Sequence, residues 1–489
     1  MPSSALPFLS GLVTEAQITA RSVADYVSGT GLRLGVTGLS RAGKTVFITS
    51  LIHNLTAGGR LPVFRASAEG RVTAATLQAQ PDDAIPRFAY EDHLASLTLD
   101  RTWPDSTRRI SELRLKLDFE RKGGWRPRTA SLTLDIIDYP GEWLLDLPLL
   151  DKSFAQWSRE TLEASAEAGR AGLAAEWRGG LQGVRPDHKA SEAVAREQAE
   201  RFTAYLRTAK ADRYALSTLP PGRFLMPGEL EGSPALTFAP LPLSNGASYA
   251  SDSLAAMMER RYEAYKTHVV RPFFRDHFSR LDRQIVLVDA LGALNSGPAA
   301  VRDLQNALGD VMQSFRAGRA SRLATLFRPR IDRILFAATK ADHLHHTSHD
   351  RLEAILRVLT ARAITRAEDV GAKIDVIALA AVRATREARV KHGNETLDAI
   401  IGTPLAGERV DGETFDGAGE AAIFPGDLPA DPRRALRGDA LALPDHEADY
   451  RFVRFRPPAA QPGPGGLAQP LPQIRLDRAL QFLIGDKLA

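Results

Sequence analysis

The segment Gly38 to Thr45 reads GLSRAGKT and fits the pattern G-x-x-x-x-G-K-[ST] at every position. Its two glycines let the backbone curl so that successive N–H groups point at one anion. Lys44 supplies a positive charge for the β- and γ-phosphates of a nucleotide, and Thr45 supplies a hydroxyl ligand for Mg²⁺. The pattern therefore predicts a phosphate-binding loop whose nucleotide contacts are Gly38, Ser40, Arg41, Ala42, Gly43, Lys44, Thr45 and Val46.

The residues on either side of this loop have the local structure that the loop requires. A short apolar strand is expected over 34–36, and an apolar-rich helix begins near Lys44. The start of that helix contributes unpaired N–H groups and the positive end of its dipole to a bound phosphate. Because the motif occurs by chance in unrelated loops, this strand–loop–helix context is what supports it.

A second motif, Asp138-Tyr139-Pro140-Gly141, follows an apolar strand expected over 131–138. An aspartate at this place in a P-loop protein holds Mg²⁺, directly or through water, and Gly141 is suited to bring its N–H to a γ-phosphate. A clearly alternating strand at 113–119 precedes it after a short link, so we expect the two strands to be antiparallel neighbours. An ordinary Pro-Gly turn at a strand end is the alternative interpretation.

The residues just before the alternating strand stand where GTPases carry a mobile segment that ligates Mg²⁺. Thr107 is the preferred ligand there, next to Ser106, and Thr102 is an alternative. Arg108 is a candidate for neutralising charge in the transition state, or else a solvated surface arginine. The predicted metal ligands are Thr45, Thr107 and Asp138.

Three further apolar strands are expected at 284–288, 333–338 and 374–380. The first ends in a second D-x-x-G at Asp289, a rival to Asp138 that we interpret as a structural copy because it follows a long helical region. The second ends in Thr339-Lys340-Ala341-Asp342, which fits [NT]-K-x-D. The carboxylate of that motif accepts hydrogen bonds from guanine N1 and N2, donors that adenine lacks, and the lysine stem covers the base.

Five stretches together resemble the YcjX-like P-loop proteins, a bacterial stress-linked family with a Ras-like GTPase core. They are GLSRAGKTVFITSL (38–51), TWPDSTRR (102–109), DYPGEW (138–143), VLVDALGALNSG (286–297) and TKADHL (339–344). The resemblance implies guanine nucleotide binding, slow hydrolysis, a link to the phage-shock response and a neighbouring inner-membrane partner protein. It also implies nucleotide contacts by Trp103, Ser106, Thr107 and Arg108, and a place beside the base for His343.

After D-x-x-G, Ras-like enzymes place a Gln that orients the attacking water, whereas this chain has Glu142. A carboxylate can hold a water, but it adds negative charge near the γ-phosphate, and Arg41 is a candidate to offset that charge. We therefore expect slow intrinsic turnover or dependence on a partner. Ala381 and Val382, after the last strand, stand where a backbone N–H contacts guanine O6. The candidate catalytic residues are Lys44, Arg41, Thr107, Arg108 and Glu142.

Composition sets broad limits on the 489-residue chain. It contains no cysteine, which excludes disulfides and cysteine–zinc sites, and its net charge of +4 is too small over this length to argue for nucleic acid binding. No apolar run approaches the ~18 residues of a membrane-spanning helix, and no secretory signal is evident. We expect a cytoplasmic protein, and the resemblance implies a peripheral place at the inner membrane through a partner.

The predicted fold is α/β: a P-loop NTPase with a Ras-like G domain, a mixed and mostly parallel sheet, a helical insertion and a C-terminal β-rich extension. Irregular structure is expected over 58–107, and the helical stretch 474–488 is expected to dock on the body or to serve as a partner-binding tail. The predicted segments are an N-terminal helix at 1–30, the two halves of the GTPase domain at 31–144 and 281–400, the helical insertion at 145–280, and the extension with a C-terminal helix at 401–489.

The predicted function is GTP and GDP binding with Mg²⁺ and slow GTP hydrolysis, used as a switch. Two alternatives remain open from the residues. The first is an ATPase or kinase in which T-K-x-D is accidental, and the second is a scaffold that binds nucleotide with negligible turnover. Base preference separates the first alternative from the predicted function, and single-turnover hydrolysis separates the second.

Overall fold

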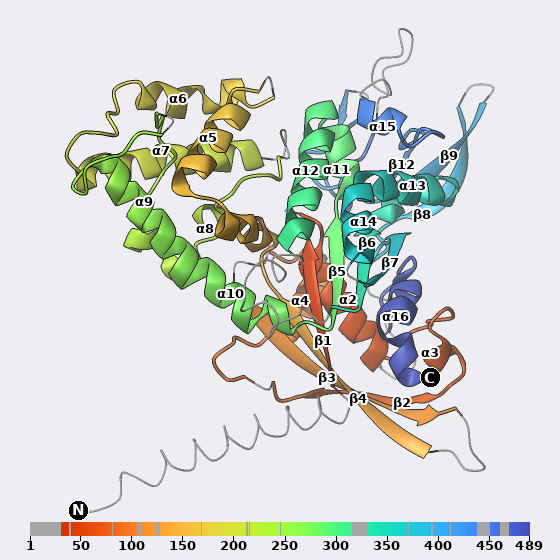
Figure 1. The fold of residues 1–489 in the computed structure, drawn as a ribbon. Coiled ribbons are helices and arrows are strands. Elements are labelled where there is room, and N and C mark those ends of the chain that lie inside the picture. The colour runs from red at the N-terminus through yellow and green to blue at the C-terminus, as the bar shows by residue number, and fades with distance from the viewer. Residues whose placement is uncertain are drawn as a thin grey trace, which may run out of the picture.

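A seven-stranded sheet forms the centre of this computed structural model (Figure 1). The structure describes residues 31–38, 41–80, 82–105, 107, 109–122, 128–167, 169–211, 214, 216–244, 246–314, 331–369, 371–392, 395–410, 412–437, 450–459 and 469–489, so the predicted helix at 1–30 lies outside the described residues. The strand order is β2-β3-β4-β1-β5-β6-β7. The strands are β1 Gly31–Gly38, β2 Val72–Gln78, β3 Ser111–Arg121, β4 Arg128–Asp138, β5 Arg283–Val288, β6 Arg333–Ala338 and β7 Lys373–Ala378.

The pairing directions confirm the mixed, mostly parallel α/β sheet. Strand β1 runs parallel to β4 on one side and to β5 on the other, and β5, β6 and β7 continue the parallel part. The predicted neighbours β3 and β4 are antiparallel, with Leu115 opposite Leu134. Because β5 is buried over its whole length, it shows the apolar run of a strand covered on both faces.

The prediction of irregular structure over 58–107 is wrong. This stretch contains strand β2, which pairs antiparallel with β3 at the edge of the sheet. In its sequence, VTAATLQ, apolar and polar residues do not alternate regularly, so the strand depends on the hydrogen bonds that β3 offers. The other elements of the stretch are α3 Arg65–Ala68, α4 Tyr90–Ala95 and the π-helical turn η1 Ser96–Asp100.

The alternation of side chains along β5 shows how helices cover the two faces of the sheet. Val286 and Val288 join one core, while Ile285 and Leu287 join the other. The second core is closed by α2 Lys44–Thr56 and α16 Leu476–Ile484. The first core is closed by α11 Ala290–Asn295, α12 Pro298–Ser314, α13 His349–Leu359 and α14 Ala361–Glu368, together with the helices between β4 and β5.

The chain between β4 and β5 is mostly helical, as predicted. Helices α5, α7 and α9 lie within 151–169, 192–210 and 253–270. This region, which starts from the 3₁₀ segment η2 Gly141–Asp151, shares the first core with the sheet. Its other elements are α5 Phe154–Ser165, α6 Ala171–Leu181, α7 Glu192–Lys210, α8 Gly222–Leu225, η3 Gly228–Leu230, η4 Pro234–Leu236, α9 Leu254–Tyr265, η5 Lys266–Val270, α10 Arg271–Asp276 and η6 Phe278–Arg280.

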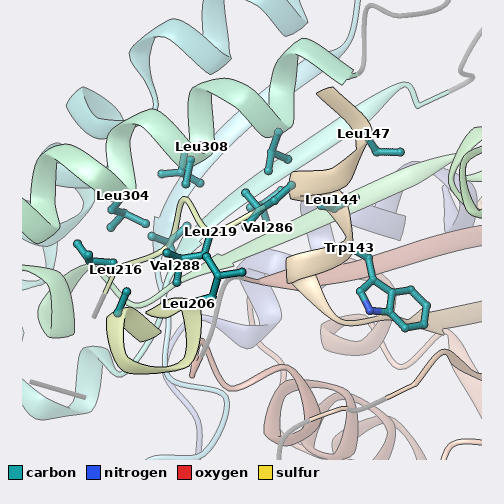
Figure 2. Close-up of a cluster of buried hydrophobic side chains, with 14 of the residues drawn as sticks. Trp143, Leu144, Leu147, Leu206, Leu216, Leu219, Val286, Val288, Leu304 and Leu308 are labelled. Atoms are coloured by element: carbon teal, nitrogen blue, oxygen red, sulfur yellow. The ribbon is translucent and has the colours of Figure 1, made fainter. Parts of the chain in front are cut away.

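Figure 2 shows how η2 joins the helical insertion to the sheet. Trp143, Leu144 and Leu147 of η2 lie in one cluster with Leu206, Leu216 and Leu219 of the insertion and with side chains of β5 and α12. Trp143 is 4% exposed, and its indole N–H donates to the carbonyl oxygen of Met226. The segment after Asp138 is therefore packed between the sheet and the insertion.

A small β-rich region follows the central sheet. Its three-stranded antiparallel sheet has the order β12-β9-β8 and begins at Arg386, ahead of the β-rich extension predicted at 401–489. The segment 451–455 makes one isolated bridge, between Phe455 and Pro404. The elements are β8 Arg386–His392, β9 Glu395–Gly402, β10 Arg409–Val410, β11 Glu413–Thr414, β12 Ala421–Ile423 and α15 Arg434–Arg437.

The C-terminal helix α16 docks on the body, the first of the two uses that the sequence allowed. Leu476, Leu480 and Leu483 lie on one face of the helix and are each buried in the second core. Beyond the helix lies the short 3₁₀ turn η10 Gly485–Leu488, where Asp486 pairs with the buried guanidinium of Arg283 at 2.5 Å. None of the helices in the described part of the chain combines the length and the apolar composition of a membrane-spanning segment.

We expect Leu480→Ala to lower the free energy of unfolding by about 2–5 kcal/mol, because it removes buried methyl groups and leaves a cavity. Lys487→Ala, at an exposed position of the same C-terminal segment, is the control and should change stability by less than about 0.5 kcal/mol. Denaturant unfolding measures both variants. Equal stability of the two would mean that this helix does not hold the core together.

Candidate nucleotide-binding site

The loop between β1 and α2 has the backbone that its glycines allow. Gly43 adopts φ 77° and caps α2, which begins at Lys44 as predicted. A Cβ at Gly38 would lie 2.8 Å from the Cβ of Ala42 and 2.8 Å from the carbonyl oxygen of Leu287, so a side chain would not fit there. The Lys44 ammonium donates to the carbonyl oxygen of Gly38 at 3.4 Å.

The parallel register of β1 and β4 places Asp138 opposite Val36, at the same edge of the sheet as the loop. The Thr107 hydroxyl donates to Asp138 Oδ2 at 2.7 Å, and the hydroxyls of Thr45 and Thr107 are 3.4 Å apart. The other carboxylate oxygen, Asp138 Oδ1, is buried and has no hydrogen-bond partner among the described residues. The three predicted metal ligands therefore lie together.

This set of oxygen atoms fits a magnesium ion. Two hydroxyls and one carboxylate are ligands that Mg²⁺ accepts, and the buried Oδ1 of Asp138 has a lone pair to offer. Burial raises the pKa of Asp138 to about 6, while Lys44 and the Thr107 hydroxyl act in the opposite direction. Thr102, the alternative ligand, is exposed. The structure thus brings Thr107 to this cluster.

The T-K-x-D motif directly follows β6. Lys340 adopts φ 61°, and its ammonium donates to Asp289 Oδ2 at 2.5 Å. Asp289 Oδ1 also accepts the Gly292 N–H at 2.9 Å at the start of α11. Burial acts to raise the pKa of Asp289, but Lys340 outweighs it and the pKa is lowered. Asp289, in the second D-x-x-G, therefore holds the Lys340 side chain in place. Asp138, in the first, is the aspartate that contacts the predicted metal ligand Thr107.

Asp342 and His343 lie in the short turn η7 Ala341–His343. Asp342 Oδ2 accepts the Ala384 N–H at 2.8 Å, and the Thr385 hydroxyl donates to the Asp342 carbonyl oxygen at 2.5 Å. Burial lowers the pKa of His343, which keeps the imidazole neutral near pH 7. These contacts fix the loop in which the predicted base-reading carboxylate stands.

One cavity of about 450 Å³ runs from the phosphate-binding loop to the T-K-x-D motif. Gly38, Asp138, Gly141 and Glu142 are not among its lining residues, and Ser40, Ser106 and Arg108 lie outside the described part of the chain. The predicted site residues that line it are Arg41, Ala42, Gly43, Lys44, Thr45, Val46, Trp103, Thr107, Lys340, Asp342, His343, Ala381 and Val382.

The C-terminal extension also lines the cavity, through Leu405, Arg454 and Phe455, which sequence reasoning missed. The Phe455 ring meets His343 edge-on, with centroids 5.5 Å apart, and the Phe455 carbonyl oxygen accepts the indole N–H of Trp103 at 2.6 Å. In the sequence, Phe455 is an aromatic residue within a short apolar segment. No local pattern connects this segment with the T-K-x-D motif, which lies more than a hundred residues earlier.

Comparison with known proteins agrees with the motifs. Residues 32–488 match the YcjX-like family, DUF463. The chain belongs to the YcjX-like family. It is 40% identical over 470 residues to a protein named Ras-like GTPase YcjX from Escherichia coli (strain K12), across 94% of this chain and 96% of that protein. It is 36% identical over 482 residues to a protein of the same name from Shewanella oneidensis, across 94% of each chain. The predicted family is confirmed.

In this member of the YcjX-like family, the charge of Glu142 is offset by a residue that the motifs did not indicate. The Lys210 ammonium, at the end of α7, lies 2.7 Å from Glu142 Oε1. Arg41, which the sequence offered for this purpose, donates to the carbonyl oxygen of Lys210 at 2.8 Å. Lys210 is therefore a cation beside Glu142, because the helical insertion folds back onto the phosphate-binding loop. The role of Arg41 in offsetting charge at the phosphates stays a prediction.

The backbone of Glu142 is enclosed by the insertion, so a side chain at Gly222 should disturb it. A Cβ at Gly222 would lie 2.0 Å from the Glu142 carbonyl oxygen, closer than real atoms approach. We expect Gly222→Ala to destabilise the protein by about 1–3 kcal/mol through overpacking.

Gly172→Ala is the matched control, because a Cβ at this helical glycine meets nothing within 4 Å. It should be neutral or stabilising by up to about 1 kcal/mol. Thermal unfolding of the two variants compares them directly. A Gly222→Ala protein as stable as Gly172→Ala would contradict the tight contact with Glu142.

Proposed function

We propose that this chain binds guanine nucleotide together with Mg²⁺ and hydrolyses GTP slowly, as a regulatory switch. The observation that carries the proposal is the cavity of about 450 Å³ that joins the phosphate-binding loop to the T-K-x-D motif. A nucleotide needs both ends, since the phosphates bind at the first and the base is read at the second. The two relatives named Ras-like GTPase YcjX support the same function.

Each cluster of the site has a part in this function. Lys44 and the loop amides bind the β- and γ-phosphates, and the Gly141 N–H meets the γ-phosphate. Thr45, Thr107 and Asp138 would hold Mg²⁺, which supplies positive charge to the phosphate oxygens when it is bound. Asp342 accepts the guanine N1 and N2 hydrogens at the other end of the cavity.

The wider role in the cell belongs to the same proposal. The family resemblance implies a stress-related function linked to the phage-shock response, an inner-membrane partner protein and a cytoplasmic location. These points rest on the resemblance alone. Within the chain, we propose that the insertion at 145–280 and the extension at 401–489 act as subdomains around the nucleotide site.

The preference for guanine over adenine nucleotides tests whether T-K-x-D is a guanine-binding motif. We expect the protein with Mg²⁺ to bind fluorescent GDP at least tenfold more tightly than fluorescent ADP, a difference of about 1.4 kcal/mol. Asp342→Asn should lose that preference and favour xanthine nucleotides, because an amide donates to the xanthine C2 oxygen where a carboxylate cannot. Fluorescence titration with the three nucleotides measures both proteins.

Asp350→Asn, at an exposed carboxylate of α13, is the control and should keep the wild-type preference. Equal affinities of the wild-type protein for GDP and ADP would contradict guanine recognition by T-K-x-D and would favour an ATPase or kinase. GTP binding without hydrolysis in a single-turnover assay would favour the scaffold alternative.

The extension should contribute directly to base binding. We expect Phe455→Ala to weaken GDP binding by about tenfold or more, because an aromatic contact with a base is worth roughly 1–3 kcal/mol. Trp103, whose indole N–H is bonded to the Phe455 carbonyl oxygen, gives a fluorescence signal on the same side of the cavity.

Val453→Ala removes packing from the same buried cluster as Phe455 but does not touch the cavity, so it is the matched control. It should leave GDP affinity within about threefold of wild type. If both variants lose affinity equally, Phe455 acts only through the stability of the extension, and its proposed contact with the base is wrong.

A further inference from the structure

Glu142 is enclosed at the point where the helical insertion meets the phosphate-binding loop. Its side chain is 7% exposed, and its Oε1 lies 2.7 Å from the Lys210 ammonium. The Arg41 guanidinium, from the phosphate-binding loop, donates to the carbonyl oxygen of Lys210 at 2.8 Å. One residue of the insertion therefore contacts both the loop and the segment that follows Asp138.

The packing around Lys210 fixes its position. Lys210 is the last residue of α7, and Leu206 and Ala209 in the same turn are buried in the core shared with the sheet. The carboxyl end of a helix carries partial negative charge, which favours a cation at this place. Gly222 packs closely against the backbone carbonyl group of Glu142. The meeting of the two charges is thus set by the fold around them.

The Lys210–Glu142 pair reduces the negative charge near the proposed γ-phosphate site. A carboxylate after D-x-x-G adds negative charge where a water must approach a triphosphate. An ammonium group at 2.7 Å offsets that charge, and salt screens a mostly buried pair much less than an exposed one. Removing one member of a mostly buried pair is costly, because the remaining charge loses a close counter-charge. Lys210 therefore allows a glutamate to stand where Ras-like enzymes use a glutamine.

We propose that Lys210 is a positioning residue for GTP hydrolysis: it orients and neutralises the Glu142 carboxylate, which accepts a hydrogen bond from the attacking water. The proposal rests on the proposed GTPase function. In that reaction the water oxygen bonds to the γ-phosphorus while the bond from this phosphorus to the β–γ bridging oxygen breaks. The bridging oxygen keeps the electron pair on GDP, one water proton stays on the released phosphate, and the other passes to solvent.

The same contact makes hydrolysis depend on the insertion. Lys210 reaches Glu142 only while the end of α7 lies against the phosphate-binding loop, a placement that Arg41 also supports. Any partner that moved α7 would separate Lys210 from Glu142. The insertion is therefore the element through which a partner would change the rate.

Single-turnover GTP hydrolysis with Mg²⁺ and equilibrium binding of fluorescent GDP test the proposal. We expect Lys210→Met to slow hydrolysis about tenfold, or about 1.4 kcal/mol of barrier, with GDP affinity changed less than about twofold. Lys210→Arg keeps the charge and should retain most of the rate. Arg207→Met, at an exposed position in the same last turn of α7, should behave like wild type.

A glutamine at position 142 separates a charge effect from a loss of folding. In the Glu142→Gln background, Lys210→Met should change the rate by less than about threefold, since a neutral side chain needs no cation. The double variant also removes both buried charges, so it folds even where Lys210→Met alone does not. An equal loss in both backgrounds, or a Lys210→Met rate at or above wild type, overturns the proposal. Wild-type protein that binds GTP without hydrolysing it contradicts the proposed GTPase function instead.

Discussion

The parallel pairing of β4, β1, β5 and β6 is the constraint on which the rest of the structure depends. Parallel strands end at the same edge of a sheet, and in open α/β sheets ligands bind outside those carboxyl ends. Here that edge carries the phosphate-binding loop after β1, Asp138 at the end of β4 and the T-K-x-D motif after β6. The phosphate-binding loop and the T-K-x-D motif, far apart in the sequence, therefore line one cavity.

The segment after Asp138 ties this edge to the helical insertion. In η2, Trp143 and Leu147 belong to the core that the insertion and the sheet share, while Glu142 pairs with Lys210. The start of η2, which contacts the γ-phosphate in the proposed function, thus also connects the sheet with the helical insertion.

The C-terminal part of the chain contributes at two separate places, the second core and the base end of the cavity. Helix α16 closes the second core together with α2, so this helix is needed for the sheet to be covered on both faces. The segment around Phe455 reaches the base end of the cavity and holds Trp103 through its carbonyl oxygen. The extension therefore contributes to both stability and the proposed site.

The sequence by itself determined the phosphate-binding loop, the strands of the parallel sheet and the family. These features depend on local spacing: glycines where the loop curls, apolar runs where strands are buried, and a hydroxyl next to the lysine. It also placed Thr107 near Asp138, since the order of motifs along a P-loop fold limits the choice. Tertiary structure alone decided the edge strand β2, the contact of Phe455 with the cavity and the pairing of Lys210 with Glu142. Each of these features joins residues that are far apart in the sequence and that no periodicity or motif spacing connects. Hydrogen bonds and ion pairs between such segments form only when the chain has packed.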